Sequence, residues 1–383
     1  MVYVLPNDLQ RVRTTLGQQL DEISETDVAH IVRKELPLLS DVAAFETVDQ
    51  VLTDMNGMGP LETLIKIPGV TDVLVNGPQD VWFDRGNGLE HSSITWSDEY
   101  ELREFAVRLA QQMNRRLDEV QPFVDVRLKN GIRMHAIIPP LAQNGTCLSF
   151  RILKDDLRRL HELESIGMMD QPTADIINNI LDSGLSFLIC GGTGTGKTTL
   201  LSAMLHEVSQ DQRVVVIEDL YEISIKNPHV INLQVRQPNV EGLGEVTMRS
   251  LVRQALRMRP DRLVIGEVRG VEIIDLFTAL NTGHQGGCAT VHANSAADVT
   301  ARIEALGLLS GIPLSAVHSL FCSAISLIIE VKNISGVGRK ISGLHLVELI
   351  DGQARIKPVY NWLTGEISRD GIEKYEKLVK REF

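Results

Sequence analysis

Cysteine is scarce in this chain of 383 residues, with four in all. Cys147, Cys190, Cys288 and Cys322 stand apart from one another and form no CxxC pair. This spacing excludes a tetracysteine zinc ribbon and lacks the disulfide framework of small secreted proteins. We therefore expect reduced thiols in a cytosolic protein.

Positive charge is also in short supply. The 38 Lys and Arg residues face 50 Asp and Glu residues, which leaves a net charge of −12. Binding along a nucleic-acid backbone requires concentrated positive charge. We therefore do not expect nucleic acid as a partner, although a local basic patch is compatible with this total.

Long hydrophobic runs are missing as well. The longest apolar segment, 312–331, is interrupted by Pro313, His318, Glu330 and several serines. It predicts a core helix running into a strand, not a membrane span. The first residues lack the basic and apolar regions of a signal peptide. These absences predict a cytoplasmic protein with no direct insertion into a membrane.

The pattern of apolar residues divides the chain into four regions, enough for two or three domains with their own cores. Residues 1–56 are expected to form a helical N-terminal segment. Residues 57–153 show the short strand-like runs of an α+β domain. Residues 154–172 are charged and rich in turn formers, which indicates a linker. In residues 173–383, β-branched runs alternate with helical segments, which is typical of an α/β domain whose mostly parallel sheet is covered on both faces.

Single elements can be placed within these regions. Asp41 is expected to cap a helix in the N-terminal segment. In the α+β domain, one helix is predicted at about 98–114, with strands at 70–75, 81–84, 123–128, 132–138 and 147–153. In the α/β domain, the predicted strands are 186–190, 213–218, 262–267 and 287–292, and the helices are 197–209, 247–258 and 271–281.

The strongest motif is GGTGTGKT at residues 191–198. It fits GxxxxGK[ST] between a predicted strand and a predicted helix, which is the context that a P-loop requires. Its glycines let backbone N–H groups face phosphate oxygens at a helix N-terminus. We expect Lys197 to reach the β- and γ-phosphates of ATP and Thr198 to bind Mg²⁺. The predicted nucleotide-binding residues are Gly192, Thr193, Gly194, Thr195, Gly196, Lys197, Thr198 and Thr199.

Two acidic strand ends follow the P-loop. Glu218 closes the strand in VVVIEDLYE, which also contains Glu222, and Glu267 closes the strand in LVIGE. One such carboxylate can hold Mg²⁺ through water while another orients the attacking water. Either alone could be a solvated acid or a helix cap. Together, downstream of a P-loop, they favour catalysis.

A histidine segment, GHQGGCATVHANS, lies further along the chain. Its His284 and His292 could contact phosphate or the neighbouring carboxylates. Either histidine taken singly is more often a satisfied core residue, so this interpretation depends on the motifs before it.

Four motifs in this order resemble the type II/type IV secretion ATPase superfamily. GGTGTGKTT, VIEDLYE, RPDRLVIGEVRG and GHQGGCATVHANS correspond to the family's Walker A motif, Asp box, Walker B motif and His box. The segments GMGPLETLIKIPGVTDVLVNGPQDVWFDRG and DVRLKNGIRMHAIIPPLAQNGTCLSFRI are similar to the N-terminal domain of the tight-adherence (Flp-type) pilus assembly ATPases. The resemblance covers roughly residues 57–331 and implies a RecA-like P-loop domain behind an α+β domain.

The resemblance also implies roles for single residues. Glu218 would orient the attacking water with Glu222 in support, and Glu267 would act on Mg²⁺. His292 would sense the γ-phosphate or help to close the site, and His284 would assist. The family places arginines of the N-terminal domain against the γ-phosphate. These match Arg133 and Arg151 here, with Arg127 a weaker match, although alternating arginines on half-exposed strands can equally form a solvated face.

By this resemblance the chain would be a hexameric cytoplasmic motor that hydrolyses ATP with Mg²⁺. It would act at the inner face of the plasma membrane through a platform protein, powering assembly or retraction of a Flp or type IV-like pilus, or type II secretion. The family's zinc insert and its large extra N-terminal domain are absent, which favours the Flp-type or conjugative branches. One alternative is a conjugation or type IV secretion ATPase that moves DNA or protein. Another is an ATP-gated scaffold with negligible turnover. No functional residue is assigned after residue 335, where the pattern is strand-like.

Overall fold

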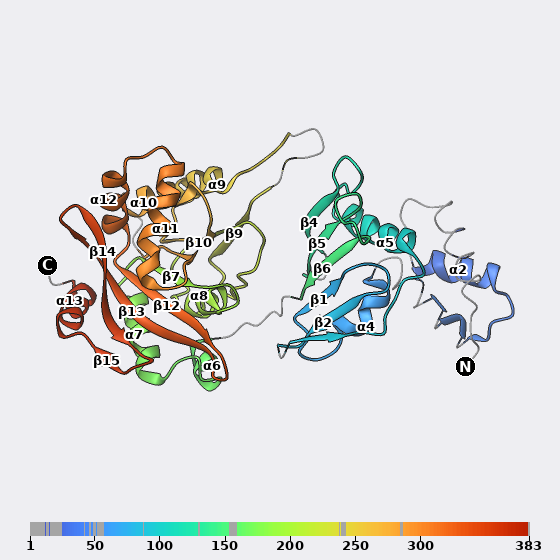
Figure 1. The fold of residues 1–383 in the computed structure, drawn as a ribbon, viewed down its shortest axis with the longest axis horizontal. Helices are drawn as coiled ribbons and strands as arrows, with labels where there is room; N and C mark the ends of the chain where they lie inside the picture. Colours follow the sequence, from blue (N-terminus) through green and yellow to red (C-terminus); the bar gives the residue numbers. More distant parts are fainter. Residues whose placement is uncertain are drawn as a thin grey trace. The chain divides into compact units, whose positions relative to one another are not determined.

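The chain forms two compact units, Met1–Lys154 and Asp155–Phe383, each with its own core. The computed structural model describes residues 12, 15, 25–41, 43–45, 47, 48, 51, 57–86, 88–128, 131–152, 159–236, 238, 243–283 and 286–381. Figure 1 shows the ribbon of both units.

Most described residues before residue 57 in the first unit are helical. Helix α2 (Glu25–Glu35) is followed by helical turns wherever residues 41–51 are described. Val28, Val32 and Val51 of these helices are buried together. The predicted cap at Asp41 is wrong, because the hydroxyl of Ser40 accepts from the N–H of Ala43 at 3.3 Å. A serine one residue earlier offers the same kind of acceptor.

An antiparallel sheet of six strands, in the order β3-β2-β1-β6-β5-β4, dominates the rest of this unit (Figure 1). Along each central strand, buried residues alternate with half-exposed ones, so one face of the sheet carries the core. Helix α5 contributes Leu102, Phe105 and Leu109 to that core. The elements after residue 56 are η1 (Gly59–Leu61), α4 (Glu62–Ile65), β1 (Asp72–Val75), β2 (Val81–Asp84), β3 (Leu89–His91), α5 (Glu99–Gln112), β4 (Phe123–Arg127), β5 (Arg133–Ile137) and β6 (Cys147–Arg151).

The second unit is an α/β domain around a sheet of nine strands, in the order β15-β14-β13-β12-β7-β11-β10-β8-β9. The neighbours from β12 to β9 pair in parallel, and β13, β14 and β15 are added in antiparallel fashion. The strands are β7 (Phe187–Gly191), β8 (Val214–Glu218), β9 (Val230–Gln234), β10 (Arg262–Val268), β11 (Cys288–His292), β12 (Leu327–Ile334), β13 (Gly338–Ile350), β14 (Gln353–Asn361) and β15 (Glu366–Ile367).

Helices cover both faces of this sheet, which confirms the predicted fold class. Leu188 and Cys190 of β7 belong to the core under α9–α12, and Phe187 and Ile189 belong to the core under α6, α7, α8 and α13. The helices are α6 (Leu160–Ser165), α7 (Gln171–Asp182), α8 (Lys197–His206), α9 (Met248–Ala255) with η2 (Leu256–Met258), α10 (Glu272–Leu280), α11 (Ala296–Leu309), α12 (Leu314–Ala324) and α13 (Arg369–Lys380).

The predicted linker at 154–172 is wrong over much of its length. Leu160 and Leu163 of α6, together with Met168, are buried in the core of the second unit. The charged residues between them are those of a helix that exposes one face to solvent. The segment 312–331 does form a helix, α12, followed by strand β12. Among the described residues, no helix combines the length and apolar character needed to cross a bilayer.

Candidate active site

The P-loop lies between the buried strand β7 and the first turn of α8. Gly196 stands at the N-cap of α8 with φ +95°, a conformation that side chains other than glycine rarely adopt. Gly191 is required for a different reason. A methyl group there would lie 2.5 Å from the carbonyl oxygen of Val331 and 2.7 Å from Oγ1 of Thr195. Thr195 is itself fixed, because its hydroxyl donates to Gly192 O at 2.9 Å.

Lys197 is the buried cation of this loop, with 7% of its surface exposed. Its Nζ donates to the carbonyl oxygens of Gly191 at 3.0 Å and Gly192 at 2.8 Å, and it lies 3.3 Å from Nδ1 of His292. Burial lowers the pKa of Lys197, and the nearby charge of Glu267 opposes that shift. The ammonium is therefore held inside the loop, where a bound phosphate would meet it.

His292 connects this lysine to an acidic strand end. Its Nε2 pairs with Oε1 of Glu267, at the end of the neighbouring strand β10. Burial lowers the pKa of His292, although the charge of Glu267 works in the other direction. A neutral ring with its proton on Nε2 presents Nδ1 to the ammonium of Lys197 and the N–H of Nε2 to the carboxylate of Glu267.

Arg269 extends the same chain of contacts. Its Nε donates to Oε2 of Glu267 at 2.8 Å, and its guanidinium lies 3.8 Å from Oδ2 of Asp219. Lys197, His292, Glu267, Arg269 and Asp219 thus form a continuous series across the carboxyl ends of β7, β11, β10 and β8. Ligands of open α/β sheets bind at these strand ends.

Glu218 is held in place by the backbone. It is 4% exposed, and its Oε1 accepts from the N–H groups of Glu222 at 3.1 Å and Ile223 at 3.0 Å. A methyl group on Gly266 would lie 2.8 Å from Cγ of Glu218. The glycine in LVIGE therefore makes room for the carboxylate of the preceding motif. The half-buried side chain of Glu222 lies on the same loop.

The remaining P-loop residues predicted to bind nucleotide surround the start of α8. Thr198 and Thr199 are half-buried in its first turn, and Thr193 and Gly194 are exposed in the loop before it. His284 lies outside the described residues. Among the described residues, no three His, Cys, Asp or Glu side chains gather as a metal site. One hydroxyl and one carboxylate acting through water match Mg²⁺ in a nucleotide site, since this ion keeps several waters and takes substrate phosphates as ligands.

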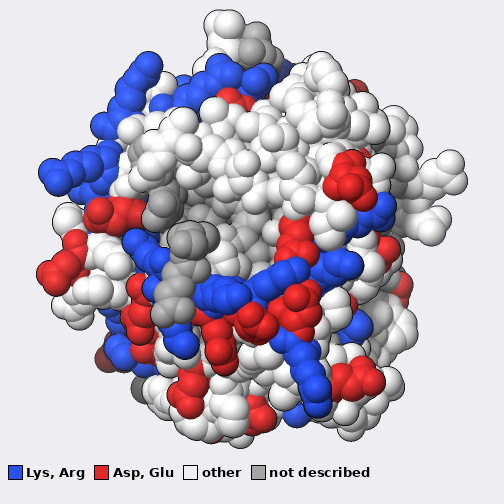
Figure 2. Space-filling model, turned by 90° about the vertical axis from the view of Figure 1, so that its left-hand side faces the viewer, with Lys and Arg blue, Asp and Glu red and all other residues white. Residues whose placement is uncertain are grey.

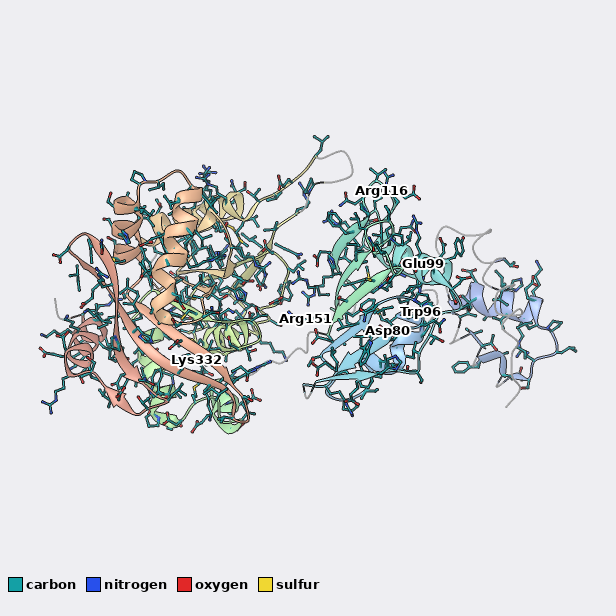
Figure 3. The ribbon with its side chains drawn as sticks, in the orientation of Figure 1. Asp80, Trp96, Glu99, Arg116, Arg151 and Lys332 are labelled. Atoms are coloured by element: carbon teal, nitrogen blue, oxygen red, sulfur yellow. The ribbon has the colours of Figure 1, made fainter. Side chains whose placement is uncertain are left out.

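The arginines predicted from the family resemblance lie in the first unit, across neighbouring strands. Arg133 is paired in register with Arg127 on one side and with Arg151 on the other. Nε of Arg133 lies 3.2 Å from Asp125, and Nε of Arg151, at the end of β6 (Figure 3), lies 3.4 Å from Asp72. Adjacent like charges on a sheet repel one another, and the carboxylates of Asp125 and Asp72 offset that repulsion here.

Two basic residues beside the P-loop series were missed by the sequence analysis. Arg269 stands in RPDRLVIGEVRG two residues after Glu267, which is the signal that could have identified it. Arg339 on β13 is placed only by the fold. A methyl group on Gly196 would lie 3.3 Å from its Cδ. No motif in the chain marks that proximity.

Known proteins share both the sequence and the fold. Residues 54–337 match the family model of the type II/IV secretion system protein. A Mycobacterium tuberculosis protein, provisionally named for conjugal transfer, is 45% identical over 350 residues, spanning 90% of this chain and 99% of that protein. The conjugal transfer protein TrbB of Rhizobium radiobacter is 30% identical over 237 residues, spanning 61% of this chain and 70% of TrbB.

Among solved structures, the pilus retraction motor PilT with bound ADP gives a TM-score of 0.55 at 18% identity, covering 85% of this chain and 89% of PilT. The ATPase DotB of Legionella pneumophila gives a TM-score of 0.50 at 15% identity, covering 84% of each chain. At such identities the likeness shows a shared fold.

Proposed function

Because this chain belongs to the type II/IV secretion system protein family and is an ATPase, we propose that it hydrolyses ATP with Mg²⁺ at the P-loop of its second unit to drive macromolecular transfer. The observation that carries this proposal is the contact of Lys197 with His292, and of His292 with Glu267, beside the P-loop. These groups stand where a γ-phosphate would be bound and cleaved.

Binding of the triphosphate is assigned to residues 192–199. The N–H groups at the start of α8 and the ammonium of Lys197 provide the positive end of the site. To reach the β- and γ-phosphates, Lys197 exchanges its present acceptors for phosphate oxygens. The hydroxyl of Thr198 and, through water, the carboxylate of Glu267 would hold Mg²⁺. That ion supplies neutralisation of the charge on the phosphate oxygens.

Hydrolysis breaks the bond between the γ-phosphorus and the oxygen that bridges it to the β-phosphate. A water molecule supplies the new oxygen, ADP leaves, and the water's protons pass to phosphate and solvent. Glu218 is assigned to orient this water, since two backbone N–H groups fix its carboxylate in one direction. Glu222 supports that loop. Positioning and electrostatics carry most of such a reaction.

His292 is assigned to sense the γ-phosphate. When phosphate oxygens draw the ammonium of Lys197 away, Nδ1 of His292 loses its donor, and the contacts from Glu267 to Arg269 and Asp219 readjust. This gives the site a nucleotide-dependent signal. His284 is carried forward as an assisting residue on the family resemblance alone.

Arg133 and Arg151 are assigned to the γ-phosphate as charges supplied by the first unit, with Arg127 next to them. Arginine contacts of this type accelerate phosphoryl transfer by about 10³–10⁵-fold. If the first unit must close to bring them to the nucleotide, each round of hydrolysis is tied to a movement of that unit. Chemical energy would thereby become mechanical work.

The assembly in which this happens is proposed to be a homo-oligomeric ring, a hexamer by resemblance to the family. We place it in the cytoplasm, at the inner face of the plasma membrane, through a membrane platform protein. A ring predicts low turnover in dilute monomer and a rise with protein concentration. Light scattering and phosphate release measured on the same samples would test this. A monomer as active per subunit as the assembly would contradict it.

The substrate moved by the motor is proposed to be that of a conjugal or type IV secretion apparatus. This reading is supported by the relatives of this chain named for conjugal transfer, one of them nearly colinear with it. It is therefore preferred to the pilus assignment, which was the first expectation from the sequence.

Pilus assembly or retraction is the second candidate. It is favoured by the likeness of two segments of the first unit to tight-adherence ATPases. It is also favoured by the net charge of −12. On the face seen in Figure 2, Lys and Arg are interleaved with Asp and Glu, beside a broad area without charge. Such a surface suits protein substrates better than DNA.

One experiment tests the activity and separates these substrates. Phosphate release is measured for the wild type and for Glu218→Gln, with ADP binding as the check that the P-loop is intact. A loss of turnover in the variant with unchanged ADP affinity is expected. Wild-type turnover in Glu218→Gln would overturn its assignment. Stimulation by DNA that disappears at high salt would identify DNA transfer, and the absence of stimulation would favour a protein substrate.

A further inference from the structure

Glu330 is a buried carboxylate with no part in the steps above. Only 8% of its side chain is exposed. It lies on β12, where it is paired in register with Cys190 of β7, the residue directly before the P-loop. A buried charge is costly unless it is paired, so its partners show what it holds in place.

Two basic groups compensate this charge. Nζ of Lys332 lies 3.2 Å from Oε1 of Glu330, and Nε2 of His345 lies 3.5 Å from Oε2. Figure 3 labels Lys332 on β12. Burial raises the pKa of Glu330, but hydrogen bonds from His345 and Lys332 and their charges outweigh it and bring the pKa to about 2. The carboxylate is therefore ionised throughout the physiological range.

The third contact of Glu330 is to the start of a helix. Oε1 accepts from the N–H of Ala296, the first residue of α11, at 3.3 Å. The N-cap residue, Ser295, makes no capping bond with its side chain, and its hydroxyl donates to Asp298 at 2.7 Å. Glu330, on strand β12, therefore provides the hydrogen-bond acceptor and the negative charge that stabilise the N-terminus of a helix.

This helix start lies four residues after His292. Residues 293–295 join the end of β11 to α11, so anchoring Ala296 limits where His292 can lie. His292 is paired in register with Gly191 on one side of β7, and β12 flanks the other side. The carbonyl of Val331 occupies the space next to Gly191. The end of β7 is thus enclosed by His292 and by the residue that follows Glu330.

We propose that Glu330 is a positioning residue for ATP hydrolysis. Its carboxylate fixes the start of α11 and thereby holds His292 against Lys197 and Glu267. This inference rests on the proposed role of His292 in the reaction. The inference predicts that replacing Glu330 lowers turnover by displacing His292. It predicts no such effect from a general loss of stability.

The test is a double-mutant cycle between Glu330→Gln and His292→Ala, with kcat and the KM for ATP measured for each protein. Glutamine keeps the volume and removes the charge. We expect Glu330→Gln to lower kcat about 10-fold, as for supporting groups around other sites, with KM changed by less than about twofold. In the His292→Ala background, Glu330→Gln should cause no further loss.

Glu304→Gln is the matched control, because Glu304 also lies on α11 and pairs with a histidine, with 3.3 Å between its Oε1 and Nε2 of His318. It should leave kcat unchanged. If Glu330→Gln does not fold, as judged by ADP binding, Lys332→Met perturbs the same carboxylate from a half-exposed position and takes its place in the cycle. Equal losses in both backgrounds, or no loss at all, would overturn the inference. If His292→Ala itself has wild-type kcat, the proposed role of His292 fails instead.

Discussion

The two sheets of this protein place their polar groups in different ways. In the first unit, one face of the sheet carries the core, and the strands alternate buried and half-exposed residues. In the second unit, all residues of β7 and β8 are buried, and polar side chains gather where the parallel strands end. The candidate catalytic residues of the second unit therefore lie at strand ends, and the candidate arginines of the first unit lie on a sheet face.

This difference bears on how firmly each set of residues is held. Glu218 and Lys197 are fixed by backbone donors and acceptors in a closed core. Arg133 and Arg151 lie on half-exposed strands, each with an aspartate near its guanidinium. Buried, hydrogen-bonded groups are suited to a preorganised reaction centre. Exposed arginines are suited to a charge that is brought to the reaction and withdrawn from it.

The largest effect is expected for the lysine of the second unit. Lys197→Ala removes the buried ammonium, and we expect kcat/KM for ATP to fall by about 10⁴-fold. One charged donor is worth about 10²–10³-fold in turnover, and its phosphate contact also supports binding. Phosphate release and ATP affinity would measure this. Lys377→Ala, which removes an exposed lysine paired with Glu373 on α13, is the control and should behave as the wild type.

The arginines of the first unit should give the next largest effect. We expect the double variant Arg133→Ala with Arg151→Ala to lower kcat about 10³-fold. It removes the two guanidinium charges that are proposed to stabilise the transferring phosphoryl group. ADP affinity should be unchanged, since the P-loop is intact. Arg85→Ala, which removes an arginine paired with Glu90 in the same unit, is the matched control. Wild-type turnover in the double variant would show that the row serves as a solvated face.

A smaller effect is expected from pH. Because burial lowers the pKa of His292 below its ordinary 6.5, the ring is neutral at pH 7 and gains a proton only in more acidic solution. Protonation of Nδ1 removes the contact with Lys197 whose exchange for phosphate is the proposed sensing step, so turnover should fall by about tenfold per pH unit below the pKa of His292. A His292→Gln variant should lose this acid limb. An acid limb that persists in the variant would assign it to another group.

The lowered pKa of His292 also makes the stability of the folded state depend on pH. The folded state binds the proton of His292 less readily than the unfolded state does, so this group favours folding above pH 6.5. Its contribution is lost as the pH falls from 6.5 through the folded pKa.

On the alkaline side, burial lowers the pKa of Lys197. Turnover should therefore decline at a pH below the ordinary value of 10.5.

The smallest effect on the site is expected from a change in the core of the first unit. Met134 is fully buried there, and Met134→Ala should lower the free energy of unfolding of that unit by about 2–5 kcal/mol. ADP affinity of the second unit should change by less than about twofold, because the described residues that form its two cores all belong to the second unit. Calorimetry and ADP titration would test this. A matched loss of ADP affinity would show that the units fold as one.

Much of the fold could be predicted because apolar periodicity is a local property. The strand expected at 81–84 is β2 itself. The strand expected at 186–190 is displaced from β7 by one residue at both ends, and the one expected at 213–218 starts one residue before β8. Strand β9 was not predicted, since its burial is partial along its length. The predicted linker extends too far, over α6, because polar residues stand between the buried Leu160 and Leu163 of that helix.

What the sequence determined by itself was the P-loop, the acidic strand ends, the histidine segment and the division into an α+β and an α/β region. All of these depend on residues close together in the chain, where spacing alone selects the local structure. Tertiary structure decided the partners. Only packing brings Arg339 close to Gly196 and Glu330 into contact with the first residue of α11. These contacts join segments far apart in the chain, and a local sequence pattern carries no information about such distances.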